Sequence, residues 1–159
     1  MADQLLIYTD GSSRGNPGPG GYGALLMWGS KCKELSQGYR RTTNNRMELM
    51  AVIAALQALT KTGVQIVIHS DSSYVVNTVE KRWLQGWLRT NFKGKKNADL
   101  WRLYHQLSLA HNIKFVWVKG HADNPYNNRC DELATAAADS RNWLIDEGFE
   151  QEESHPTLL

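Results

Sequence analysis

Two short apolar runs, each followed closely by an aspartate, constrain the fold most strongly. The first run is Leu5–Thr9, with Asp10 directly after it, and the second is Gln65–His69, with Asp71 two residues later. The segment between the runs is long enough to form a helical crossover between two parallel strands. If these strands are neighbours in one sheet, about 4.8 Å apart, the two carboxylates meet at the same edge. Ligands gather at this edge in open α/β sheets.

The remaining patterns predict a mixed α/β sheet flanked by helices. A stretch rich in Gly, Pro and Ser, Gly11–Gly21, is expected to be a loop. The further strands expected are Tyr22–Trp28, Lys33–Gln37 and Lys114–Val118. The helices expected are Asn45–Lys61, Ser72–Val79, Asp99–Ala110 and Asn128–Ser140. Short connections between the first three strands indicate an antiparallel meander.

The distribution of charge indicates a polyanionic partner. All 18 Lys and Arg residues lie at or before Arg141, whereas five of the 16 acidic residues follow it. The chain is long enough for one domain with its own core. We therefore expect a basic, nucleic-acid-binding domain over residues 1–141 and an acidic, mobile tail over residues 142–159.

The sequence predicts neither export nor membrane insertion. Its first residues lack the basic segment and long apolar core of a signal peptide. The longest apolar run, Leu49–Leu56, is far shorter than the ~18 residues of a membrane span. Cys32 and Cys130 form no CxxC pair, which argues against a zinc site or a disulfide framework. We expect a monomer in the reducing cytoplasm.

Four carboxylates are candidate metal ligands because each lies near a predicted strand end or helix start: Asp10, Glu48, Asp71 and Asp131. Each also has a structural explanation. Asp10 could form an Asp-Gly turn, Glu48 a capping box, and Asp71 a helix cap, whereas Asp131 could interact with a helix dipole. In a chain otherwise built for a polyanion, such acids favour divalent cations placed between protein and phosphate.

The segment Lys81–Lys96 combines six cations with aromatic residues and contains no acid. One interpretation is a solvated basic helix whose aromatic side chains join the core. The other is an arm that contacts phosphates and offers aromatic faces to a nucleic acid. The aromatic residues concerned are Trp83, Trp87 and Phe92.

Several strings resemble type 1 ribonuclease H in order and spacing. They are TDGSSRGNPGPGGYG, TTNNRMEL, HSDS and VKGHADNPYNNRCDELA, and the resemblance covers about residues 4–140. It implies a five-stranded mixed sheet flanked by helices. It also implies endonucleolytic hydrolysis of the RNA strand of an RNA–DNA hybrid, leaving 5′-phosphate and 3′-hydroxyl ends. The alternatives are a non-catalytic hybrid- or duplex-binding module and another metal nuclease of the same fold.

The resemblance also implies roles for individual residues. The four candidate carboxylates match the metal ligands of the family, and His121 matches its loop histidine. His121 could transfer a proton or assist product release, and the alternative is a solvated loop residue without a function in the reaction. The segment 81–97 matches the family's basic protrusion, including Lys93, Lys95 and Lys96. Trp83 and Trp87 match its DNA-strand channel. Arg41, Thr43 and Asn97 match its DNA phosphate pocket, and Asn16, Asn44 and Asn45 match minor-groove contacts.

The carboxylate set predicts the cofactor. Hard oxygen ligands without a His or Cys cluster favour Mg²⁺, with Mn²⁺ as an alternative, over zinc. The resemblance implies two ions in each active site when substrate is bound. The chain departs from the bacterial pattern in a shortened protrusion, in Ser73 where Gln is usual and in Asp123 where Gly is common. None of these departures involves the four carboxylates.

Overall fold

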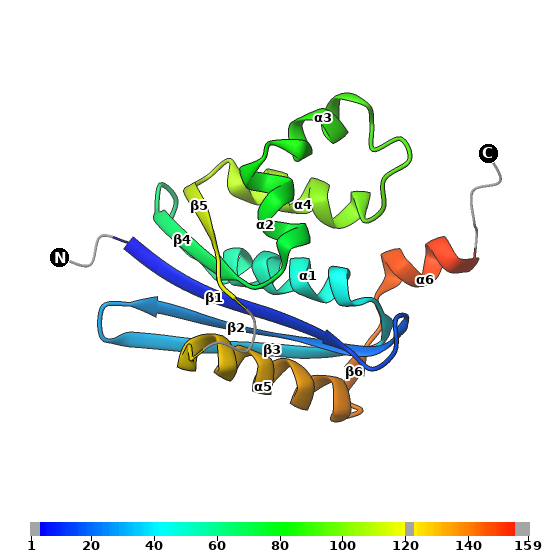
Figure 1. The fold of residues 1–159 in the computed structure, drawn as a ribbon, viewed down its shortest axis with the longest axis horizontal. Coiled ribbons are helices and arrows are strands. Elements are labelled where there is room, and N and C mark those ends of the chain that lie inside the picture. Colours follow the sequence, from blue (N-terminus) through cyan, green and yellow to red (C-terminus); the bar gives the residue numbers. More distant parts are fainter. Residues whose placement is uncertain (1–3, 120–122, 155–159) are drawn as a thin grey trace.

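The computed structural model describes residues 4–119 and 123–154 and is centred on a six-stranded sheet (Figure 1). Its order is β5-β4-β1-β2-β3-β6, in which β1, β2 and β3 are antiparallel neighbours, β4 and β5 run parallel to β1, and β6 runs parallel to β3. The strands are β1 (Gln4–Ser13), β2 (Gly18–Trp28), β3 (Lys31–Thr42), β4 (Gln65–Ser70), β5 (Asn112–Trp117) and β6 (Trp143–Leu144). The predicted mixed α/β sheet is confirmed, with one short strand more than expected.

Helices cover both faces of this sheet. They are α1 (Asn44–Gln57), α2 (Ser73–Glu80), α3 (Trp83–Arg89), α4 (Ala98–Ser108), α5 (Pro125–Asp139) and α6 (Glu147–Ser154). The main core lies where α1, α2 and α4 pack with one face, and α5 covers the other face (Figure 1). Helix α1 is buried on most of its surface, as its nearly uniform apolar sequence predicts. None of the described helices is both long and apolar enough to span a membrane.

The glycine-rich stretch is mostly strand, and its assignment to a loop was wrong. Strand β1 continues to Ser13 and pairs with β2 through Gly11↔Tyr22 and Ser13↔Gly20. Gly15, with a φ of +93°, lies in the short turn that remains between β1 and β2, whereas Gly21 serves packing, because a Cβ on it would lie 2.6 Å from the carbonyl oxygen of Ala134 in α5. Helix α5 can therefore approach β2 directly.

The acidic end of the chain has regular secondary structure within residues 143–154, where the sequence shows no periodic pattern, and the mobility expected of residues 142–159 stays a prediction. Strand β6 pairs with β3 in the register Gly38↔Trp143, and α6 follows it. The anchor is Asp146, which is 4% exposed and accepts hydrogen bonds from Thr42 Oγ1 and Arg46 Nε, both at 2.7 Å. Sequence periodicity misses such an anchor because one buried ion pair, rather than an apolar face, holds the segment.

Candidate active site

The parallel pairing of β1 and β4 brings Asp10 and Asp71 together. Thr9 of β1 is paired with Ser70 of β4. Asp10 directly follows Thr9, and Asp71 directly follows Ser70, so the two aspartates lie side by side. Asp10 lies within β1 instead of ending it, because β1 continues to Ser13 along β2. Asp71 does follow the end of β4. The predicted meeting of the two residues at one edge of the sheet is therefore confirmed.

Glu48 reaches the same edge from the first turns of α1. This helix begins after Thr43, whose hydroxyl accepts a hydrogen bond from the backbone N–H of Arg46 at 3.3 Å. A Cβ on Gly11 would lie 2.3 Å from the backbone nitrogen of Glu48, so only glycine lets β1 and α1 approach this closely. The Gly11 N–H donates to Glu48 Oε1 and also to Asp10 Oδ1, the latter at 2.9 Å.

Carboxylate oxygens of Asp10, Glu48 and Asp71 lie within 4.8 Å of one another. Asp10 and Glu48 are buried, and Asp71 is half-buried. Burial raises the pKa of Asp10 to about 7, and the negative charge of Asp71 adds to this effect. Burial also raises the pKa of Glu48 well above its ordinary value, with a further contribution from Asp10. Asp10 and Glu48, whose ionisation burial opposes, form together with Asp71 a site at which a bound cation would stabilise the ionised carboxylates.

The structural explanations for the four acids do not hold. Asp10-Gly11 is part of a strand, Glu48 accepts from β1 instead of its own helix end, and Ser72 rather than Asp71 caps α2. Helix α5 begins at Pro125, capped by Asn124, which places Asp131 beyond the first turn. Position at a cap or turn therefore does not account for these residues.

A cleft of about 450 Å³ lies over the three carboxylates, and Asp131 lines it from α5. Asp131 is exposed and lies outside the group of three, although its charge contributes to the raised pKa of Asp10. Asn127, which the sequence reasoning missed, also lines the cleft. It is 3% exposed, and its Oδ1 has no hydrogen-bond partner within the described structure. His121 lies outside the described residues.

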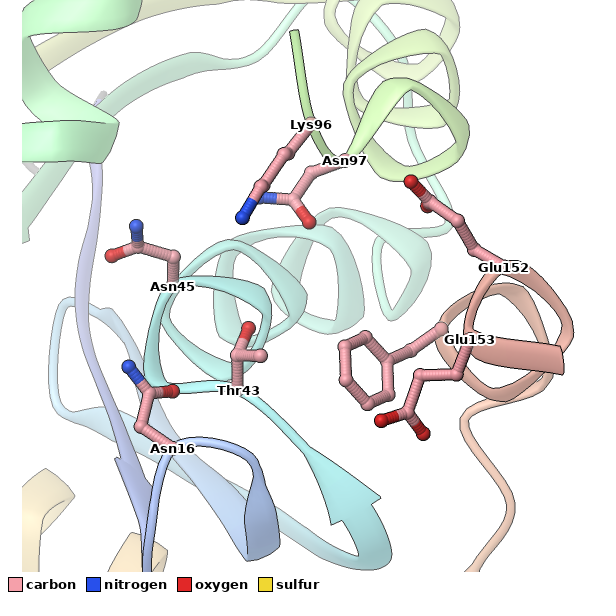
Figure 2. A pocket seen from close by; sticks show the side chains of 8 residues that line it. Asn16, Thr43, Asn45, Lys96, Asn97, Glu152 and Glu153 are labelled. Carbon is pink, nitrogen blue, oxygen red and sulfur yellow. The ribbon is translucent and has the colours of Figure 1, made fainter. Parts of the chain in front are cut away.

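A second cavity, of about 270 Å³, adjoins this cleft through the shared residue Asn45 (Figure 2). It contains two of the three residues predicted for a DNA phosphate pocket, Thr43 and Asn97, together with Lys96 and Asn16. Asn16 Oδ1 accepts from the backbone N–H of Asn44 at 3.0 Å, which ties the β1–β2 turn to the start of α1. The third predicted residue, Arg41, does not line the cavity.

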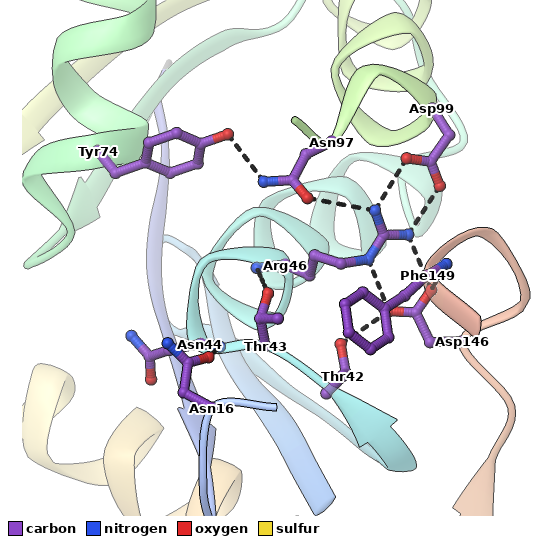
Figure 3. A network of polar contacts seen from close by, with 10 residues as sticks. All are labelled: Asn16, Thr42, Thr43, Asn44, Arg46, Tyr74, Asn97, Asp99, Asp146 and Phe149. Atoms are coloured by element: carbon purple, nitrogen blue, oxygen red, sulfur yellow. Dashed lines mark hydrogen bonds and ion pairs between the residues drawn. The ribbon is translucent and has the colours of Figure 1, made fainter. Parts of the chain in front are cut away.

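A buried polar network fixes the wall of this second cavity (Figure 3). Arg46, only 1% exposed, donates to Asp146 and, through Nη2 at 2.7 Å, to Asp99. Asn97 Oδ1 accepts from Arg46 Nη1 at 3.4 Å, and Asn97 Nδ2 donates to Tyr74 Oη at 3.0 Å. Sequence reasoning missed Arg46, because a cation in a basic chain gives no sign of burial.

The basic protrusion, residues 81–97, stands away from the sheet and consists of α3 with the residues just before it and the loop that follows it (Figure 1). Its six cations are exposed, and none of them forms an ion pair with a described residue. Of its aromatic residues, Trp83 is 43% exposed, whereas Phe92 is 5% exposed and belongs to the core. Trp87 is half-buried against Trp101, at 6.2 Å between ring centroids. The protrusion therefore has features of both interpretations: Phe92 joins the core, whereas the cations and Trp83 are available to a nucleic acid.

The chain matches a known protein family over most of its length. The family model described as RNase H matches residues 2–139. A ribonuclease H of Syntrophus aciditrophicus (strain SB) is 48% identical over 151 residues, which cover 92% of this chain and 87% of the relative. A ribonuclease H of Chlorobium luteolum (strain DSM 273 / BCRC 81028 / 2530) is 53% identical over 142 residues, covering 86% of this chain and 97% of the relative.

Solved structures show the same similarity. LC9-RNase H1, described as a type 1 RNase H with the type 2 active-site motif, superposes with a TM-score of 0.79 at 29% identity, covering 98% of this chain and 83% of its own. LC11-RNase H1 in complex with an RNA/DNA hybrid superposes with a TM-score of 0.63 at 27% identity, covering 86% of this chain and 98% of its own.

Proposed function

This chain belongs to the ribonuclease H family as a bacterial type 1 member, and we propose that it hydrolyses the RNA strand of RNA–DNA hybrids endonucleolytically at Asp10, Glu48 and Asp71. The observation that carries the proposal is the gathering of these three carboxylates within 4.8 Å on the floor of a polar cleft. Ribonuclease H enzymes use divalent metal ions, and a site of carboxylate oxygens fits that requirement.

The three carboxylates would hold Mg²⁺, two ions when substrate is bound, with Mn²⁺ as an alternative; Asp131 would contribute from α5. When bound, such ions lower the pKa of an attacking water and stabilise the leaving oxygen, which leaves 5′-phosphate and 3′-hydroxyl ends. Burial opposes the ionisation of Asp10 and Glu48, so a bound cation would favour the anionic form of both side chains. His121 would transfer a proton or assist product release.

Recognition of the hybrid would use the surfaces beside the cleft. Asn16, Asn44 and Asn45 offer amide groups that can bond to 2′-hydroxyls, and Asn127 adds an unpaired buried acceptor within the cleft. Thr43, Asn97 and Arg41 would bind a phosphate of the DNA strand. The protrusion, with Lys93, Lys95, Lys96, Trp83 and Trp87, would contact the same strand farther along. A cytoplasmic monomer stays a prediction.

A substrate comparison tests this proposal and separates it from its alternatives. Labelled RNA–DNA hybrid, duplex RNA and duplex DNA are incubated with the protein, with and without Mg²⁺. We expect internal cuts in the RNA strand of the hybrid only, and only with Mg²⁺. Binding of the hybrid without cleavage would indicate a binding module, whereas cleavage of duplex DNA would indicate another metal nuclease of this fold. Either result would contradict the proposal.

A further inference from the structure

Helix α6 places carboxylates beside the cavity assigned to a DNA phosphate. Glu152 and Glu153 line this cavity opposite Thr43 and Asn45 (Figure 2). In addition, both oxygens of the Glu153 carboxylate accept hydrogen bonds from the Arg41 guanidinium, from Nε and Nη2, each at 2.8 Å. This two-point contact has the same geometry with which a guanidinium binds a phosphate.

Glu153 and a phosphate would compete for the same edge of the Arg41 guanidinium. Glu153 occupies the Nε and Nη2 donors of Arg41, which a phosphate bound in the same two-point manner would need, and two anionic side chains at the cavity would repel an incoming phosphate. Residues 142–154 carry this arrangement as part of the fold, through the Asp146–Arg46 ion pair at the base of α6. The contact is thus a built feature of the protein without substrate.

The contact is nevertheless weak enough to be exchanged. Arg41 and Glu153 side chains are 47% and 34% exposed, and exposed ion pairs contribute little to stability. Helix α6 has eight residues and buries none of them, so its outer turn is held mainly by this pair and by Arg40–Glu150. Its base, by contrast, is fixed by the buried Asp146, whose Oδ1 accepts from the N–H of Phe149 at 3.3 Å (Figure 3).

We propose that Glu153 sets the affinity of the enzyme for its substrate by occupying Arg41 in place of a DNA-strand phosphate, so that hybrid binding requires exchange of carboxylate for phosphate. This inference rests on the phosphate-binding role of Arg41 under the proposed function. The exchange makes α6 an intramolecular competitor of the substrate. Because added salt screens the Arg41–Glu153 pair, the competition is strongest at low ionic strength.

The test measures hybrid binding by Asp10→Asn protein, for which we expect no cleavage, with and without Glu153→Gln. We expect the added change to tighten binding about two- to fivefold at low salt, which is the range expected for an exposed ion pair. The gain should shrink as salt increases, so the slope of log K against log[salt] should steepen by up to ~1 unit.

A matched control removes a carboxylate of the same kind elsewhere. Glu34 also pairs through two oxygens with an exposed arginine, Arg129, and lies on the same strand as Arg41, about 23 Å away along β3. This separation exceeds the Debye length of ~10 Å at 0.1 M salt. Glu34→Gln should therefore leave hybrid affinity nearly unchanged. Equal gains from Glu153→Gln and Glu34→Gln would overturn the inference, because net charge alone would then explain the effect.

An Arg41→Ala change separates this inference from the function on which it rests. We expect it to weaken hybrid binding and to abolish the gain from Glu153→Gln in the same background. If Arg41→Ala weakens binding but Glu153→Gln still tightens it, Glu153 does not act through Arg41, and only the inference fails. If Arg41→Ala leaves the affinity for the hybrid unchanged, Arg41 does not bind a phosphate of the substrate. The inference, which depends on that role, is then excluded as well.

Discussion

The carboxylate cluster and the basic protrusion place their charged side chains in opposite environments, one buried and the other exposed to solvent. Asp10 and Glu48 are buried by a strand and a helix that meet at Gly11, and burial raises the pKa of each. The protrusion holds its cations in water, on a short helix and loop that pack on the core through Leu84 and Phe92. One region is buried and costly to ionise, whereas the other holds its cations exposed to solvent.

This difference indicates a division of labour. Chemistry that depends on metal ions needs ligands fixed within a fraction of an ångström, so it belongs where backbone atoms hold the side chains. Attraction of a polyanion needs charge rather than exact placement, and exposed lysines provide it. We therefore expect changes in the cluster to alter turnover and changes in the protrusion to alter affinity.

The largest effect is expected from Asp10→Asn. Loss of a metal-binding carboxylate should remove several kcal/mol of transition-state stabilisation, which lowers turnover more than about 10³-fold. Hybrid affinity should change little, because phosphate contacts provide most of it. Single-turnover cleavage and anisotropy binding with the same hybrid would measure both. A variant that keeps a tenth of the wild-type rate would exclude Asp10 as an essential metal ligand.

His121→Ala should have a smaller effect. General acid–base assistance contributes about 10²–10⁴-fold, and solvent can replace part of it, so we expect a loss near the lower end of this range. Turnover measured from pH 6 to 9 should lose the dependence that a titrating imidazole gives to the wild-type enzyme. Identical profiles and rates for the two proteins would leave His121 without a catalytic role.

Replacing Lys93, Lys95 and Lys96 with Ala should weaken binding. Each lysine is exposed, and Lys96 lines the cavity assigned to a phosphate. If each neutralises one phosphate, the slope of log K against log[salt] should shrink by up to ~3 units, and by about one if only Lys96 makes contact. Titration of Asp10→Asn protein, with and without the three changes, at several salt concentrations measures this. Unchanged slopes would mean that another surface holds the hybrid.

The smallest effect concerns stability in the absence of divalent metal. The pKa of Asp10 in the folded protein, about 7, lies above its ordinary value of 3.8, so its ionisation destabilises the fold as pH rises through this interval. Asp10→Asn removes this penalty. We expect melting temperatures in EDTA to agree near pH 4 and the variant to melt at least about 2–4 °C higher at pH 8. An equal difference at both pH values would contradict a penalty from ionisation.

The sequence predicted the sheet and the meeting of Asp10 with Asp71, because strand order and parallel crossover follow from local patterns. It did not predict the extension of β1 through Gly11, since the glycines there allow α1 and α5 to approach the sheet and resemble a loop in composition. The secondary structure within residues 143–154 was also not predicted, because the segment is held by an ion pair between Arg46 and Asp146, which lie 100 positions apart. Pairings of that kind depend on tertiary structure and leave no periodic signal.

Kinetic separation of binding from chemistry tests the division of labour most directly. Initial rates of hybrid cleavage by the variant without Lys93, Lys95 and Lys96 are measured over a range of substrate concentrations that reaches saturation. Contacts that act equally in the ground and transition states should raise KM and leave kcat close to the wild-type value. A lowered kcat with an unchanged KM would show that the protrusion takes part in the chemical step and would contradict the division between the two regions.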